Sequence, residues 1–206
     1  MKKLLYLVLS LIALALIYLR LNYGEASQQL PVASPTSQTN SATPESSPRI
    51  DLSEKLDNDY FTLAYDKSAT TSSYRSPDSQ EWVISYMGED QKKSGRMQTE
   101  LWDGYSLTIT RFETVGNKPD QKQAEADRSS IIDACGEENS TPIKPGKVGN
   151  YETITFYGGC LGEGDYHYLM MANTLYRLTI MTLGSEQLKP HYQAVVGAML
   201  NSLSFK

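Results

Sequence analysis

The chain has 206 residues and a formal net charge of −5 at pH 7. This length accommodates one domain with appended segments. Acidic and basic residues are interspersed, as on an ordinary solvated surface, and the negative balance excludes the electrostatic footprint of a nucleic-acid-binding protein.

An apolar run near the N-terminus, Leu4–Leu19, is interrupted only by Ser10. As a helix it would span about 24 Å, and neighbouring residues can extend it towards the ~30 Å hydrocarbon core of a bilayer. Two lysines precede the run and Arg20 follows it, which predicts a cytoplasmic N-terminus and an extracytoplasmic remainder. We expect residues 1–23 to be a transmembrane anchor. A signal peptide cleaved after Ala26 is the alternative, and it would leave the protein secreted.

Residues 24–56 are rich in Ser, Thr, Pro, Gln and Asn and contain little that a core could bury. Such a segment cannot offset its conformational entropy, so it is predicted to be a disordered linker. The globular domain is expected to occupy residues 57–206.

The first half of this domain contains three runs of β-forming residues, and the two segments between them are polar. Strands are predicted at Tyr60–Tyr65, Trp82–Met87 and Tyr105–Phe112. Loops are predicted at Lys67–Gln80 and Gly88–Gly95. The third strand alternates apolar with Ser and Thr side chains, which indicates that one face has partial solvent access.

The second half begins with a predicted helix that starts near Asn117 and ends near Cys135. A loop is predicted at Gly136–Gly146 and a strand within Val148–Tyr157. The last helix should begin near Ser185 or Pro190, because apolar residues recur at helical spacing after it.

The clearest pattern is Tyr166–Leu183, which predicts two strands joined at Asn173–Thr174. On both sides of this break, successive side chains alternate between the two faces of a strand. Asn tolerates the positive φ of a tight turn. A single helix over the whole run is the alternative. With this hairpin, the sequence predicts an α+β domain: a mainly antiparallel sheet of about six strands flanked by helices.

The run DYFTLAYDKSA, the strand NTLYRLTI and the ending NSLSFK resemble the PsbP-like domain. This superfamily includes the photosystem II extrinsic protein P and a nuclear-transport factor that binds the GTPase Ran. The resemblance covers about residues 57–206, although Asp66 and Lys67 stand where the family usually has Pro and Trp. It implies an α-β-α sandwich used for binding or assembly, and it carries over no site residues.

The chain has two cysteines, Cys135 and Cys160. In an exported domain, an even number of cysteines favours a disulfide. Such a bridge would close a loop of about 25 residues, worth roughly 3 kcal/mol in the chain-entropy model. Two buried free thiols are the main alternative.

Three potential metal ligands alternate along the chain: Glu163, Asp165 and His167. On a strand they would share one face and could hold a metal ion. The glycines around Glu163 favour the alternative of a solvated turn.

No nucleophile elbow, phosphate loop or paired-cysteine metal motif occurs in the sequence. The sequence therefore favours a non-enzymatic, membrane-tethered extracytoplasmic module, without a cofactor, that binds an envelope protein or a glycan. The alternative function is an envelope metal-binding protein or enzyme that uses Glu163, Asp165 and His167.

Overall fold

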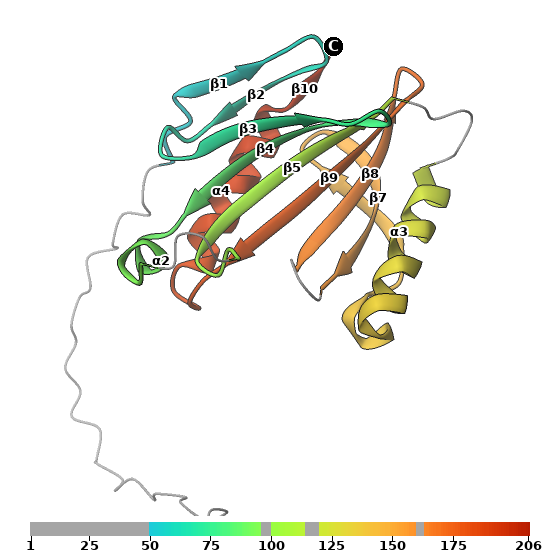
Figure 1. The fold of residues 1–206 in the computed structure, drawn as a ribbon. Coiled ribbons are helices and arrows are strands. Elements are labelled where there is room, and N and C mark those ends of the chain that lie inside the picture. Colours follow the sequence, from blue (N-terminus) through green and yellow to red (C-terminus); the bar gives the residue numbers. More distant parts are fainter. Residues whose placement is uncertain (1–49, 96–99, 114–119, 160–162) are drawn as a thin grey trace, which may run out of the picture. The chain divides into compact units, whose positions relative to one another are not determined.

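Two antiparallel sheets and two long helices form the part of the chain that this computed structural model describes, which is residues 50–95, 100–113, 120–159 and 163–206 (Figure 1). The larger sheet has seven strands in the order β3-β4-β5-β9-β8-β7-β6, and the smaller has the order β1-β2-β10. Every strand pair is antiparallel. The structure therefore confirms an α+β domain built mainly on antiparallel pairing.

The strands have these bounds: β1 Glu54–Asp57, β2 Phe61–Tyr65, β3 Thr70–Arg75, β4 Ser79–Met87, β5 Gly104–Phe112, β6 Lys144–Val148, β7 Tyr151–Gly158, β8 Gly164–Met171, β9 Thr174–Leu183 and β10 Ser204–Phe205. The helices are α2 Glu89–Lys93, α3 Asp120–Cys135, the 3-10 turn η1 Glu137–Asn139 and α4 Lys189–Ser202.

The main core lies between the seven-stranded sheet and a layer formed by α4 and the small sheet. Helix α4 has buried apolar residues at helical spacing and packs against β2, β5 and β9. The sheet contributes Leu107, Ile109 and Leu178, each fully buried, and β2 contributes Phe61. Burial of each such side chain stabilises the fold by about 1.5–3 kcal/mol, so this layer supplies most of the hydrophobic stabilisation.

A smaller core lies on the opposite face, under α3. This helix packs on β7 and β8, and it buries Ala124 against Phe156, Tyr168 and Leu175. The rings of Phe156 and Tyr168 have centroids 6.1 Å apart and are nearly parallel. Figure 1 shows α3 in front of this end of the sheet, whereas α4 lies behind the other end.

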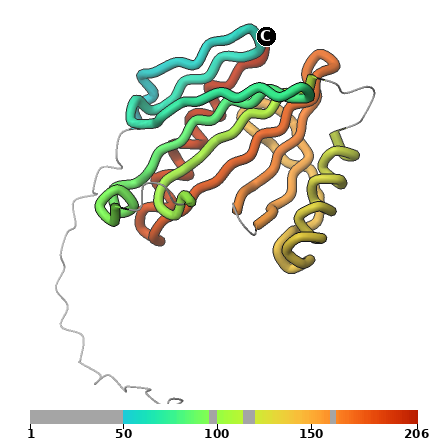
Figure 2. The backbone as a smooth tube through the Cα atoms, viewed as in Figure 1, coloured from blue at the N-terminus to red at the C-terminus, as the bar shows by residue number. Residues whose placement is uncertain are grey.

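The predicted hairpin is confirmed as the strands β8 and β9. Figure 2 shows them side by side (orange to red), joined by a tight turn. The turn lies one residue earlier than expected. Met171 pairs with Thr174, and the two residues between them, Ala172 and Asn173, have φ values of 47° and 64°. Positive φ at both positions is the geometry of a type I′ turn, which matches the twist of the strands.

Four segments differ from the sequence-based expectation. The predicted loop Lys67–Gln80 contains β3, and the predicted loop Gly88–Gly95 contains the short helix α2. The predicted loop Gly136–Gly146 contains η1 and the start of β6, and β1 lies in the range expected to be linker. The strands β1, β3 and β6 pair through their backbones, and the side chains of all these elements are mostly exposed, so burial leaves little pattern in the sequence.

The expectation of about six strands was too low for the same reason. The helix predicted from Asn117 is confirmed from Asp120 onwards, and its expected start lies outside the described residues. In the part of the chain that the structure describes, no helix is long and apolar enough to cross a membrane. The predicted anchor and most of the predicted linker lie outside that part.

Candidate binding surface

One face of β3, β4, β5 and β9 is not covered by a helix in the described part of the chain. Along β5, Leu107 and Ile109 point into the main core, so Ser106 and Thr108 point to the other face. We call this surface the open face, and it consists of Thr70, Ser72, Tyr74, Glu81, Val83, Ser85, Ser106, Thr108, Thr110, Arg177, Thr179 and Met181.

The register of the four strands arranges these side chains in rows. The first row is Thr70, Ser85, Ser106 and Met181, and the second is Ser72, Val83, Thr108 and Thr179. Neighbouring positions lie about 4.8 Å apart across the strands and about 6.7 Å apart along them. Six of these eight side chains carry a hydroxyl group, which both donates and accepts hydrogen bonds, and none is charged.

The third row, Tyr74, Glu81, Thr110 and Arg177, ends in a charged network at the border with α3. The Arg177 Nη1 donates to Asp127 Oδ2 at 2.9 Å, and its Nη2 lies 3.6 Å from Glu81 Oε1. The Thr110 hydroxyl donates to Glu81 Oε1 at 3.1 Å, and the Tyr168 hydroxyl donates to Asp127 Oδ2 at 2.7 Å. One aspartate on α3 is therefore bonded to both β8 and β9.

This network compensates the partial burial of the Arg177 guanidinium. Burial opposes the charged form, but the hydrogen bond and the charge of Asp127 outweigh it and hold the pKa of Arg177 above its ordinary value. Burial, with the neighbouring Asp127, also raises the pKa of Tyr168 well above its ordinary value. The Arg177 Nε is buried without a hydrogen-bond partner in the described structure.

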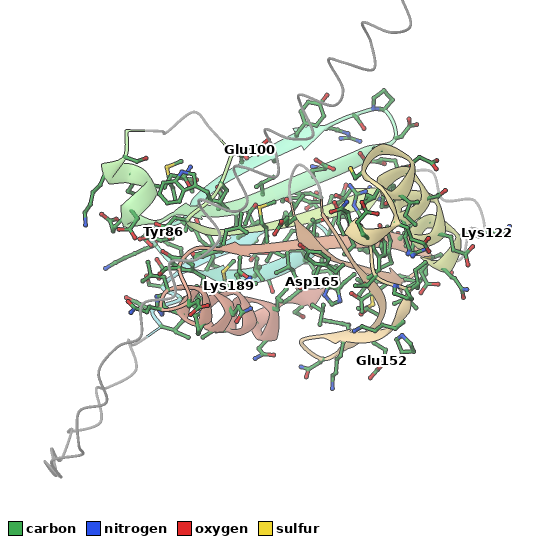
Figure 3. The ribbon with its side chains drawn as sticks, turned by 90° about the horizontal axis from the view of Figure 1, so that it is seen from below. Tyr86, Glu100, Lys122, Glu152, Asp165 and Lys189 are labelled. Atoms are coloured by element: carbon green, nitrogen blue, oxygen red, sulfur yellow. The ribbon has the colours of Figure 1, made fainter. Side chains whose placement is uncertain are left out.

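The three predicted metal ligands lie near β8, away from the open face. Asp165 and His167 pair with Ile180 and Leu178 of β9, so they point to the side of the sheet that carries α4. Figure 3 shows Asp165 on this side and Lys122 on α3. Glu163 precedes the strand. The described residues contain no group of three His, Cys, Asp or Glu side chains placed to hold a metal ion.

His167 instead makes a contact within the sheet. Its Nδ1 lies 3.2 Å from the Thr153 hydroxyl on β7. Burial lowers the pKa of His167 below its ordinary value, and the nearby Asp165 only partly opposes this shift. Glu163 lies beside Tyr157, whose pKa is raised by burial and by its hydrogen bond to Glu163. Both contacts are of the kind that stabilises the surface of a sheet.

Cys135 is the last residue of α3. No cysteine among the described residues is free. Cys160 lies outside the described residues, so the Cys135–Cys160 bridge stays a prediction.

A second buried polar cluster stabilises α2. Asp103 is almost fully buried, and its carboxylate accepts hydrogen bonds from the Tyr192 hydroxyl at 2.9 Å and from the backbone amide of Asp90 at 3.0 Å. A carboxylate on the first amides of a helix caps it. This cluster joins α2 to α4.

Sequence reasoning missed two parts of the open face. It assigned β3 to a loop, and it did not pair Asp127 with Arg177. The only local signal for the network was an arginine within the otherwise uncharged strand Thr174–Leu183.

No known protein-family model matches the chain, and no curated protein matches it.

Proposed function

We propose that this protein is a non-enzymatic, membrane-tethered binding or assembly module that acts outside the cytoplasm. The observation that carries the proposal is the open face: a broad surface of the sheet, directed away from the main core, with uncharged hydroxyl rows and one charged border. A sheet with one face in a core and the other accessible is suited to recognition because the core holds the accessible side chains in place.

The N-terminal sequence supports the cellular context. The apolar run Leu4–Leu19 and the polar residues 24–49 fit an anchor followed by a spacer. An anchored domain on a spacer can reach partners in the envelope, which are an envelope protein or a glycan in this proposal.

We further propose that the fold is a PsbP-like α-β-α sandwich. Two features support this assignment. The antiparallel sheet has a long helix packed on each face, and the last helix runs into the ending NSLSFK, whose first two residues are its final ones. The proposal concerns architecture only, and no photosynthetic or Ran-binding role follows from it.

The metal-binding alternative gains no specific support. Asp165 is exposed, His167 contacts Thr153, and the described residues form no three-ligand group. We therefore favour the binding module.

The test is affinity capture of the full-length tagged chain from its native membrane after crosslinking. The variant Ser85→Arg places a large cation in the first hydroxyl row, and Ser185→Arg places the same cation on an exposed loop after β9. We expect the wild type and Ser185→Arg to capture the same partner, and Ser85→Arg to lose it while its unfolding transition is unchanged. Equal capture by all three proteins would refute the open face as the binding surface.

A further inference from the structure

Deepening the proposed function, we propose that the open face binds an uncharged carbohydrate chain. This inference rests on that function, because it names the ligand class of the same surface. It starts from the first two rows of the open face, in which six of eight side chains are Ser or Thr and none is charged.

Three other ligand classes fit this surface poorly. Nucleic acids and anionic lipid surfaces require clustered cations, and the cation of the open face, Arg177, is already paired with Asp127 and Glu81. Protein interfaces are depleted of serine and enriched in aromatic and apolar anchors at their centre. The centre of the open face carries no aromatic residue, and three of its four side chains carry hydroxyl groups: Ser85, Ser106 and Thr108, beside Val83.

Carbohydrates match the observed groups. A sugar hydroxyl, like a Ser or Thr hydroxyl, can donate and accept, so a row of hydroxyls can pair with a row of hydroxyls in either direction. The rows extend about 14 Å across four strands, which is long enough to contact more than one sugar ring.

An aromatic residue stands at the edge of these rows. Tyr74 on β3 is 68% exposed and belongs to the open face, next to Ser72 along the strand. An exposed ring of this kind provides a flat apolar surface on which the apolar face of a sugar ring can stack. Glu81 lies opposite Tyr74 on β4, and its carboxylate can accept a hydrogen bond from a sugar hydroxyl.

The chain offers a matched control for Tyr74. Tyr157 on β7 is also exposed, at 36%, but its cross-strand partner is Asp165, so it lies on the other face of the sheet. Truncation of either ring removes a tyrosine side chain from the surface of the sheet, and only Tyr74 belongs to the proposed site.

The experiment measures cosedimentation of the full-length, detergent-solubilised chain with three insoluble neutral glycans: cellulose, chitin and starch granules. Carboxymethyl cellulose is the charged comparison. We expect binding to at least one neutral glycan that persists in high salt, because no ion pair contributes. Tyr74→Ala should weaken it about three- to ten-fold, Thr108→Arg should abolish it, and Tyr157→Ala should leave it unchanged.

Two results would overturn the inference. One is the absence of binding to all three neutral glycans. The other is binding that Tyr74→Ala and Thr108→Arg leave intact, since another surface would then be responsible. If Ser85→Arg still abolishes capture of an envelope protein while no glycan binds, the proposed function stands and the carbohydrate assignment fails. If neither the capture nor the glycan binding responds to open-face variants, both fail.

Discussion

The two faces of β5 differ although they belong to one strand. On one face, Leu107 and Ile109 are fully buried against α4 and the small sheet. On the other, Ser106 and Thr108 are only partly buried, and no helix among the described residues covers them. The first face provides stability and the second provides accessible groups held in fixed register. The difference shows how one sheet can separate the requirements of folding from those of recognition.

The part of the sheet under α3 is intermediate between these two faces in how many apolar side chains it buries. Its apolar cluster is small, and α3 is also joined to the sheet by the hydrogen bonds of Asp127 to Tyr168 and Arg177. We therefore expect substitutions to have their largest effect on stability in the main core, a smaller effect under α3 and the smallest on exposed surfaces.

Leu107→Ala should give the largest loss, about 2–5 kcal/mol in the free energy of unfolding, because it opens a cavity in the main core. The matched substitution is Thr108→Ala, the next residue on the same strand, which should cost less than about 1 kcal/mol. Chemical denaturation of both variants measures the difference. Equal losses would contradict the separation of the two faces.

Reduction of the predicted Cys135–Cys160 bridge should cost about 3 kcal/mol. The bridge would connect the end of α3 to the segment before β8, where the apolar cluster is small. Thermal unfolding with and without reductant tests this, and thiol titration of the unfolded chain is the control. Two free thiols in the untreated protein would rule the bridge out.

Asp127→Ala should destabilise the fold by about 1–3 kcal/mol, because it leaves the Tyr168 hydroxyl and the Arg177 Nη1 without the carboxylate that accepts from both. Asp133→Ala removes an exposed carboxylate from the same helix and should have little effect. A double-mutant cycle with Arg177→Ala would isolate the contribution of the ion pair. A coupling energy near zero would show that the ion pair does not help to hold α3 on the sheet.

His167→Gln should give the smallest effect, and it should depend on pH. Burial lowers the pKa of His167 below its ordinary value of 6.5, so the unfolded chain takes up a proton first as the pH falls. The wild type should therefore lose stability as the pH falls from about 7 through 6.5 and towards the lower pKa of the folded state. Denaturation midpoints of the two proteins should converge above pH 7 and diverge below 6.5. Parallel profiles would show that His167 does not titrate differently on folding.

The sequence predicted the buried strands well because burial leaves a pattern. The alternation in Tyr166–Leu183 identified β8 and β9, and the apolar spacing after Pro190 identified α4. The strand β3 was missed because all six of its residues are exposed, so its Thr and Ser content looks like that of a loop.

The open face could be predicted only in part. The alternation along β5 indicated one accessible face, but the rows depend on the register of four strands, which no single strand encodes. Likewise, Asp127 and Arg177 are 50 residues apart, and their contact depends on how α3 lies on the sheet. The resemblance to PsbP-like domains remains a prediction about architecture.

The most direct measurement is site-specific photocrosslinking of the full-length chain in its native membrane. A photoreactive residue is placed at Thr108, in the centre of the open face, or at Ser185, on the exposed loop after β9. If the open face binds a partner, the probe at Thr108 should give one discrete adduct that the probe at Ser185 does not give. No adduct at Thr108, or the same adducts from both positions, would contradict the open face as a binding surface.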